Sequence, residues 1–290
     1  MKTAIMTDTN SGITAMEAQR DGLFVLPMPV IIDGKDYLEG IDITHAELYA
    51  AMRDGRDIHS SQPAPGAFLN MWERIFMEGY DELVYIPMSS GLSGAYETAC
   101  SFAKGYPGRV WVANNRRISV TLYESVYEAY HMAQQGMVAS QIKALLEAHA
   151  GDSSIYISVN TLDYLKRSGR VTPAGAAIAN VLNLKPVLTI QGGKLDAFAK
   201  ARGMRSSQRR MITAAGDDLF QRFSRFSSKS IRIGAAGTFE NPDDAKRWTQ
   251  QLANAFPQCR VYYQPLSCSI ACHVGINAAG LGISCITEDY

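Results

Sequence analysis

The sequence lacks the features of several large protein classes. Its 290 residues contain no run of about 18 uncharged apolar residues, so we expect no membrane-spanning segment and at most transient membrane contact. The N-terminal apolar run is far too short for a secretory signal, and we therefore expect a cytoplasmic protein. Basic and acidic side chains number 28 each, which disfavours non-specific binding to nucleic acid.

Cysteine is scarce, and the common nucleotide-binding motifs are missing. The five cysteines are scattered and form no C-x-x-C pair, so we expect buried free thiols, with no disulfide framework and no metal site. Neither G-x-x-x-x-G-K-[ST] nor G-x-G-x-x-G follows a predicted strand. We accordingly expect no cofactor.

The composition is that of a globular protein, and the length allows two domains. In the first half, apolar runs that predict strands alternate with amphipathic stretches that predict helices. The strands are expected at residues 3–7, 23–32, 82–87 and 109–113, and the helices after Pro63 and at 95–102, 122–132 and 140–150. This alternation predicts an α/β fold with a mainly parallel sheet flanked by helices.

A polar break at residues 151–154 precedes a change of pattern. We therefore predict an N-terminal α/β domain over residues 1–151 and a C-terminal domain over 152–290. In the second domain, two apolar runs flank Gln191-Gly192-Gly193, which predicts an antiparallel hairpin. Helices expected at 204–223 and from 242, with strands at 231–236, 260–264 and 282–286, complete a mixed α/β (α+β) domain.

Three groups of polar residues follow predicted strands or open predicted helices. Asp8 and Thr9 come directly after the first strand, where they can cap a helix and hold neighbouring loops. Ser60 and Ser61 precede a proline, and a turn containing Ser90, Ser93 and Gly94 precedes the next helix. Free N–H groups at helix N-termini favour anions, so two converging termini would hold a carboxylate or phosphate.

Three further side chains could contact an anion. His273, near the C-terminal end, can hydrogen-bond a carboxylate and titrates near neutrality, although a lone histidine is more often structural. Arg170 and Arg202 are suited to carboxylate or phosphate oxygens, although surface arginines are usually solvated.

Five motifs in order resemble those of the DegV family over essentially the whole chain. They are Thr7-Asp8-Thr9, Ser60-Ser61-Gln62-Pro63, Ser90-Gly91-Leu92-Ser93-Gly94, Ser168-Gly169-Arg170-Val171 and Ala271-Cys272-His273. Members of this family include the fatty-acid-binding subunits of bacterial fatty acid kinase.

The resemblance implies a lipid carrier of phospholipid metabolism rather than an enzyme. A long-chain fatty acid would lie in an apolar tunnel, with its carboxyl group engaged by Ser60, Ser93 and His273. A separate ATP-dependent kinase would convert that group to an acyl phosphate, and Arg170 and Arg202 would face this partner. Two positions depart from the family pattern: Ser60 stands where threonine is usual, and Gly203 follows Arg202 where a hydroxyl residue is common.

Two other functions compete with the carrier hypothesis. A serine hydrolase could use Ser93 and His273, since the turn around Ser93 is close to the G-x-S-x-G elbow, but no acid stands out as a third member. Nucleic-acid binding could use the basic residues at positions 200, 202, 205, 209 and 210. The neutral chain and the lack of interleaved aromatics favour a solvated or partner-docking surface there instead.

Overall fold

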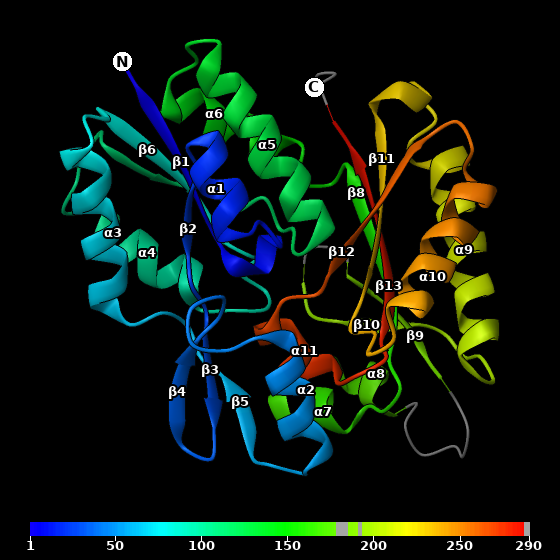
Figure 1. The fold of residues 1–290 in the computed structure, drawn as a ribbon. Coiled ribbons are helices and arrows are strands. Elements are labelled where there is room, and N and C mark those ends of the chain that lie inside the picture. Colours follow the sequence, from blue (N-terminus) through cyan, green and yellow to red (C-terminus); the bar gives the residue numbers. More distant parts are fainter. Residues whose placement is uncertain (178–184, 191–192, 287–290) are drawn as a thin grey trace.

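The computed structural model describes residues 1–177, 185–190 and 193–286. Within these residues the strands form three sheets, and helices lie over their faces (Figure 1). No helix in the described part of the chain is both long enough and apolar enough to cross a bilayer.

The first sheet is entirely parallel and has the order β2-β1-β6-β7. Side chains alternate between its two faces: Met6 and Tyr85 pack with α3 and α4, whereas Ile5 and Val84 pack with α5 and α6. The sheet is therefore covered by helices on both sides, as predicted. The bounds are β1 (Thr3–Asp8), β2 (Phe24–Leu26), β6 (Glu82–Ile86), β7 (Val110–Val112), α1 (Ala15–Asp21), α3 (Pro65–Met77), α4 (Ala95–Ala103), α5 (Val120–Gln134) and α6 (Ala139–Ala148).

A small antiparallel sheet was missed by the sequence analysis. The single strand predicted at residues 23–32 is wrong: β2 ends at Leu26, and β3 (Pro29–Ile32) belongs to another sheet. Pro27 and Pro29 interrupt the run because proline has no N–H to donate. β3 pairs with β4 (Lys35–Leu38) and β5 (Ile58–Ser60), and α2 (His45–Arg53) lies between these two strands in the chain.

The second large sheet is mixed, with the order β10-β9-β8-β13-β11-β12. Only β11 and β12 pair in parallel, and the β9–β10 hairpin is antiparallel, as predicted. Residues 191 and 192 of the predicted turn lie outside the described residues. The strands are β8 (Ser153–Ser158), β9 (Val187–Ile190), β10 (Asp196–Ala199), β11 (Ile231–Gly237), β12 (Arg260–Pro265) and β13 (Ala279–Cys285).

Helices also cover both faces of this second sheet. On the outer face lie α9 (Met204–Gln221) and α10 (Pro242–Ala255), and α5 lies against the inner face (Figure 1). Gly234 and Gly282 permit that close approach, since a Cβ at either position would lie 2.4–2.6 Å from the Val120 side chain. The structure thus confirms the predicted α/β class, with one parallel sheet and one containing antiparallel strands.

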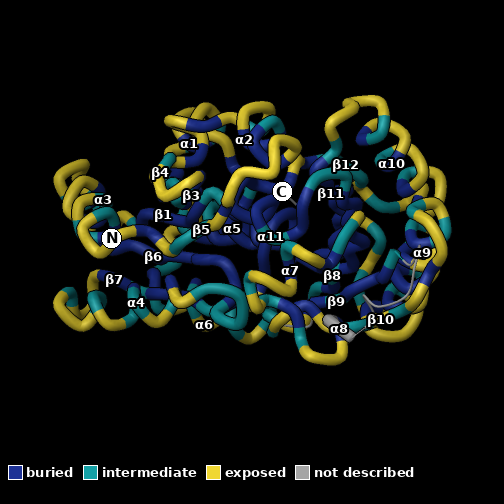
Figure 2. The backbone as a smooth tube through the Cα atoms, turned by 90° about the horizontal axis from the view of Figure 1, so that it is seen from below, coloured by how far each residue is buried: buried dark blue, intermediate teal, exposed yellow. Residues whose placement is uncertain are grey.

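Three short helices connect strands of the second large sheet. They are α7 (Asp163–Ser168), α8 (Pro173–Ala177) and α11 (Cys268–Val274), and α11 lies in the buried middle of the molecule (Figure 2). The largest core cluster includes Ile5 and Val84 as well as Ile157 and Leu188, so it spans the predicted domain boundary at residue 151. The division into two domains therefore stays a prediction.

Candidate functional site

A cavity lies between α5, α11 and the inner face of the second sheet. The space between its lining atoms, including the part open to solvent, amounts to about 700 Å³. Most of the lining is aliphatic: Met88, Leu92, Ile118, Val120, Ile155, Ile157, Ile190, Leu195, Leu266 and Leu281.

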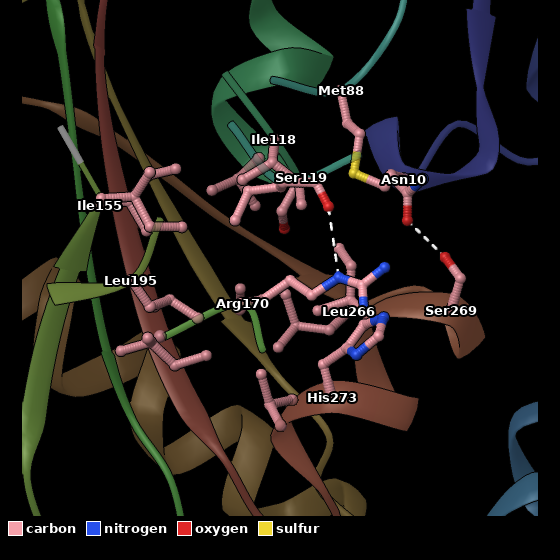
Figure 3. A pocket seen from close by; sticks show the side chains of 18 of the residues that line it. Asn10, Met88, Ile118, Ser119, Ile155, Arg170, Leu195, Leu266, Ser269 and His273 are labelled. Atoms are coloured by element: carbon pink, nitrogen blue, oxygen red, sulfur yellow. Dashed lines mark hydrogen bonds between the residues drawn. The ribbon is translucent and has the colours of Figure 1, made fainter. Parts of the chain in front are cut away.

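One end of this cavity is polar. Asn10, Arg170, Ser269 and His273 converge there, whereas Ile155 and Leu195 lie at the opposite end (Figure 3). An apolar cavity with most of its polar side chains gathered at one end matches an amphipathic ligand with one polar head.

His273 is the central polar side chain of the site. It lies in the last turn of α11, and its Nε2 atom is 2.7 Å from the hydroxyl oxygen of Ser60, 213 positions earlier in the chain. Its Nδ1 atom is buried and has no hydrogen-bond partner among the described residues. Burial lowers the pKa of His273 from 6.5 to about 4, aided by the nearby Arg170 and His59. The ring is therefore neutral at pH 7, with one nitrogen donating and the other accepting.

Ser60 reaches His273 because α11 packs against the small sheet. Ser60 is the last residue of β5, opposite Val30 of β3. Ile58 and Val30 share a buried cluster with Ala271 and Cys272 of α11. The unpredicted small sheet and α11 therefore bring together two residues that the sequence analysis had selected.

A buried polar network holds the beginning of α11. The Ser267 hydroxyl caps the helix by accepting from the N–H of Ile270, and it donates to Asn10 Oδ1 at 3.0 Å. Ser269 also donates to Asn10 Oδ1, and the Asn10 amide donates to Asp8 at 2.9 Å. The loop after β1 thus fixes the helix that carries His273.

Asp8 and Thr9 lie behind this network rather than in the cavity. Asp8 is fully buried and accepts from the N–H groups of Asn10 and Met88. These hydrogen bonds lower the pKa of Asp8, but burial of the carboxyl group raises it by more, so the net pKa lies above the usual value. Thr9 accepts from the N–H of Met28 and donates to Glu39 at 2.8 Å. Both side chains hold neighbouring segments in place.

The predicted helix N-terminus at Ser60 is wrong. Ser60 ends a strand, and α3 begins only at Pro65, without a side-chain cap. The Ser61 hydroxyl donates to the Gln62 carbonyl at 3.1 Å, so it too caps no helix. Proline can stand in the first turn of a helix, but here Pro63 comes before that turn.

The serine-rich turn before α4 lies beside the loop that follows Ser60. Thr98 of α4 donates to the side chain of Gln62 at 3.2 Å. Ser93 accepts from the N–H of Ala95, Ser90 accepts from the Asn114 side chain, and Gly94 is the N-cap of α4. Leu92 lines the cavity, whereas Ser93 is not among the lining residues. A direct role for Ser93 in carboxyl binding stays a prediction.

The two predicted partner-facing arginines have different surroundings. Arg170 follows the left-handed Gly169 that ends α7, lines the cavity, and donates from Nε to the Leu92 carbonyl at 3.5 Å. Arg202 is exposed and does not line the cavity. Only Arg170 is placed to meet a ligand there.

Asn10 and Ser269 line the cavity but were not selected as site residues from the sequence. Asn10 directly follows Asp8-Thr9, so its proximity to a chosen motif was a signal that could have been used. Ser269 offered no comparable signal because α11 was not predicted as a helix.

The geometry does not assemble the hydrolase predicted from Ser93 and His273. The hydroxyl that contacts His273 belongs to Ser60, and Ser93 bonds the backbone of Ala95. A general base in a Ser–His–acid triad needs a group that orients its second nitrogen, but Nδ1 of His273 has no partner in the described part of the chain.

Comparison with protein families identifies the chain. A model described as "Uncharacterised protein, DegV family" matches residues 2–285. The chain belongs to the DegV family. The resemblance of its five motifs to that family is thereby confirmed.

Known DegV relatives match over nearly their whole length. A DegV domain-containing protein from Deinococcus radiodurans is 28% identical over 286 residues, with 98% of each chain covered. The solved structure described as "Fatty Acid Binding of a DegV family Protein from Thermus thermophilus" is 29% identical, with a TM-score of 0.87, covering 98% of this chain and 100% of that one. A stearic acid-binding protein from Eubacterium ventriosum has the same TM-score at 20% identity and 97% coverage of each chain, which shows the shared fold.

Proposed function

We propose that this DegV protein binds a long-chain fatty acid, with the carboxyl group at the polar end of the cavity and the acyl chain along the aliphatic end. The observation that carries the proposal is the buried Nδ1 atom of His273, which has no hydrogen-bond partner among the described residues and lies at the polar end of a mostly aliphatic cavity. A buried polar atom without a partner is costly, and a ligand carboxyl group would satisfy it. Fatty-acid binding by the Thermus thermophilus protein supports this assignment.

Ser60, His273 and Arg170 form the proposed carboxyl site. In one tautomer of the neutral imidazole, Nε2 accepts from the Ser60 hydroxyl and Nδ1 donates to the ligand. In the other tautomer, Nε2 donates to the Ser60 oxygen, and the Ser60 hydroxyl donates to the ligand. Either arrangement presents a donor to a carboxylate. The Arg170 guanidinium, which lines the same end, adds positive charge and further N–H donors.

The acyl chain would provide most of the binding free energy. Burying a methylene group contributes ~0.8 kcal/mol, so about fifteen of them exceed what tight binding requires before ordering costs are subtracted. The carboxyl site then fixes the direction in which the ligand enters. A carrier of this kind supplies orientation and shielding from water.

We further propose that the bound acid is presented to a separate ATP-dependent kinase, which phosphorylates the carboxyl group. The polar end of the cavity includes Arg170, whereas Arg202 is exposed just before α9 and outside the cavity lining. Arg202 is therefore suited to contact acidic groups of the partner, with Arg170 near the head group. In this division of labour the chain itself performs no chemical step.

Native mass spectrometry of the freshly purified protein tests fatty-acid binding. The expected spectrum shows the polypeptide with one added mass equal to a long-chain fatty acid, and this species survives gel filtration. A bare polypeptide that also fails to take up added palmitic or oleic acid would contradict the proposal. Esterase assays on the same sample should show no turnover.

A further inference from the structure

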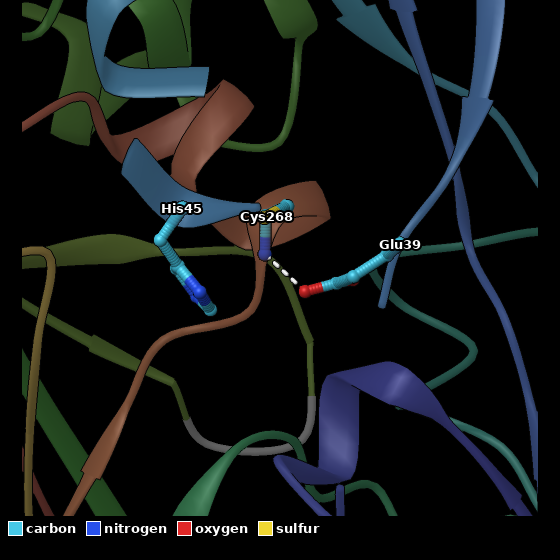
Figure 4. A group of neighbouring side chains, drawn as sticks. All are labelled: Glu39, His45 and Cys268. Atoms are coloured by element: carbon cyan, nitrogen blue, oxygen red, sulfur yellow. Dashed lines mark hydrogen bonds between the residues drawn. The ribbon is translucent and has the colours of Figure 1, made fainter. Parts of the chain in front are cut away.

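Three potential metal ligands meet on the opposite side of α11 from the cavity. The ligand atoms of Glu39, His45 and Cys268 all lie within 4.8 Å of one another (Figure 4). Glu39 follows β4, His45 is the first residue of α2, and Cys268 is the first residue of α11. Because they come from three separate segments, no spacing motif could reveal them, and the sequence analysis expected no metal.

The cluster is partly enclosed yet open to a cation. Glu39 and Cys268 are buried, His45 is half-buried, and all three line one surface groove near α1 and β2. A metal ion could therefore enter from solvent and still have most of its ligands in a protected environment.

Hydrogen bonds already orient these three side chains. His45 Nε2 lies 2.8 Å from the Leu266 carbonyl, which can only accept, so Nε2 carries the hydrogen and Nδ1 of the neutral ring carries a lone pair. A backbone carbonyl commonly orients a metal-binding histidine in this manner. Glu39 accepts from the Cys268 N–H and from the Thr9 hydroxyl, which fixes the carboxylate.

The Cys268 thiol is buried, and its sulfur lies within 4.8 Å of a Glu39 carboxylate oxygen. After the thiol loses its proton, this sulfur and the carboxylate oxygen can both bind a cation. Zinc bonds of about 2.0–2.3 Å in a tetrahedron put ligand atoms roughly 3.3–3.8 Å apart, so side-chain shifts of about 1 Å would close the site.

We infer that Glu39, His45 and Cys268 form a binding site for Zn²⁺ or a similar borderline-soft divalent cation. The thiolate, the imidazole and one carboxylate oxygen supply three ligands, and a water molecule from the groove supplies the fourth. Binding releases the thiol proton to solvent. Since Cys268 begins α11 and His273 lies in its last turn, the ion would also fix the helix that carries the carboxyl site.

Cobalt(II) titration of the reduced, metal-free full-length protein tests the site. Co²⁺ occupies zinc sites and gives an intense thiolate-to-cobalt charge-transfer band. One equivalent should produce this band, and Zn²⁺ should abolish it. Cys268→Ser should remove the band, whereas Cys272→Ser, one helical turn later, should retain it. Absence of the band at one equivalent, its persistence in Cys268→Ser, or its loss only in Cys272→Ser would overturn the inference.

A second variant covers the case in which Cys268→Ser does not fold. His45→Gln changes a half-buried side chain and keeps a donor for the Leu266 carbonyl. Its Zn²⁺ affinity, measured against a chromogenic chelator, should fall at least tenfold while the melting temperature of the metal-free protein stays close to that of the wild type. Unchanged Zn²⁺ affinity would show that the three side chains only hold α11 by hydrogen bonds.

Discussion

The two ends of the cavity are built in different ways. Much of its aliphatic end comes from strands of the second sheet, through Ile155 and Ile157 of β8, Ile190 of β9 and Leu281 of β13. Its polar end comes from the ends of elements: the turn after β1, the first and last turns of α11, and the residue after the α7 cap. Regular elements provide apolar area, which gives affinity, and element ends provide directed polar atoms, which give orientation.

Narrowing the aliphatic end should have the largest effect on lipid affinity. Leu195→Trp places an indole in the space for the acyl chain. Displacing about four methylenes at ~0.8 kcal/mol each would weaken stearic acid binding on the order of a hundredfold, with a smaller effect on shorter acids. Isothermal titration with acids of graded length measures this. Phe198→Trp, on the same hairpin but outside the lining, is the control and should bind normally. Equal losses for all chain lengths would contradict the proposed tail position.

Removing the central donor of the polar end should have the next largest effect. In His273→Ala the buried carboxylate of the ligand loses a hydrogen-bond donor, which should reduce the binding free energy by about 2 kcal/mol. This corresponds to roughly a thirtyfold loss of affinity for acids of every chain length. His59→Ala is the matched control, because His59 precedes Ser60 in β5 but is exposed and lies outside the cavity lining. An equal loss in both variants would show that the imidazole of His273 plays no specific role.

The stability of the lipid-free protein should report the burial of His273. Its folded pKa of about 4 lies below the ordinary value of 6.5, so the unfolded chain takes up a proton first as the pH falls. Stability should therefore be lost as the pH falls from about 6.5 to 4. Urea unfolding measures the free energy of unfolding at each pH. Between pH 7 and 5 this free energy should fall by about 1–2 kcal/mol less in His273→Gln than in the wild type. If the free energy of unfolding of the two proteins depended on pH in the same way, His273 would not be a buried neutral imidazole with a lowered pKa.

The two selected serines should differ in a paired experiment. Ser60→Ala removes the partner of His273 and should weaken fatty-acid binding about fivefold, the effect of one hydrogen bond of ~1 kcal/mol. Ser93→Ala should weaken binding less and should destabilise the start of α4, because the Ser93 hydroxyl accepts from Ala95. A larger loss of affinity in Ser93→Ala would place the carboxyl group at the turn before α4.

Arg202 should have the smallest effect on lipid affinity. It is exposed and outside the cavity lining, so Arg202→Ala should retain fatty acid normally. With the kinase of the source organism, the rate of acyl-phosphate formation should fall about two- to fivefold, which is the effect expected from the loss of one exposed ion pair with the partner. Arg205→Ala, three residues later, serves as the control. If Arg202→Ala releases the lipid, the arginine belongs to the binding site and not to a partner surface.

The sequence predicted the regular parts of the molecule better than the polar end of its cavity. The parallel strands and the β9–β10 hairpin have strong apolar periodicity and clear turn signals, and the structure confirms them. The small sheet has strands of three and four residues, too short for a periodic pattern, and α11 is buried on nearly every side. Ser60 and His273 were selected individually, but their contact depends on those two unpredicted elements.

The position of the carboxyl group is the central claim, and carbon NMR tests it most directly. Palmitic acid labelled with ¹³C at the carboxyl carbon should give one bound resonance in the wild-type protein. That resonance should move clearly in Ser60→Ala and His273→Gln and stay in place in Phe198→Trp. It should also broaden little when a soluble paramagnetic reagent is added, because the polar end is largely buried. The account would be contradicted by a bound resonance that keeps its chemical shift in Ser60→Ala and His273→Gln and that the paramagnetic reagent broadens as much as the resonance of the free acid.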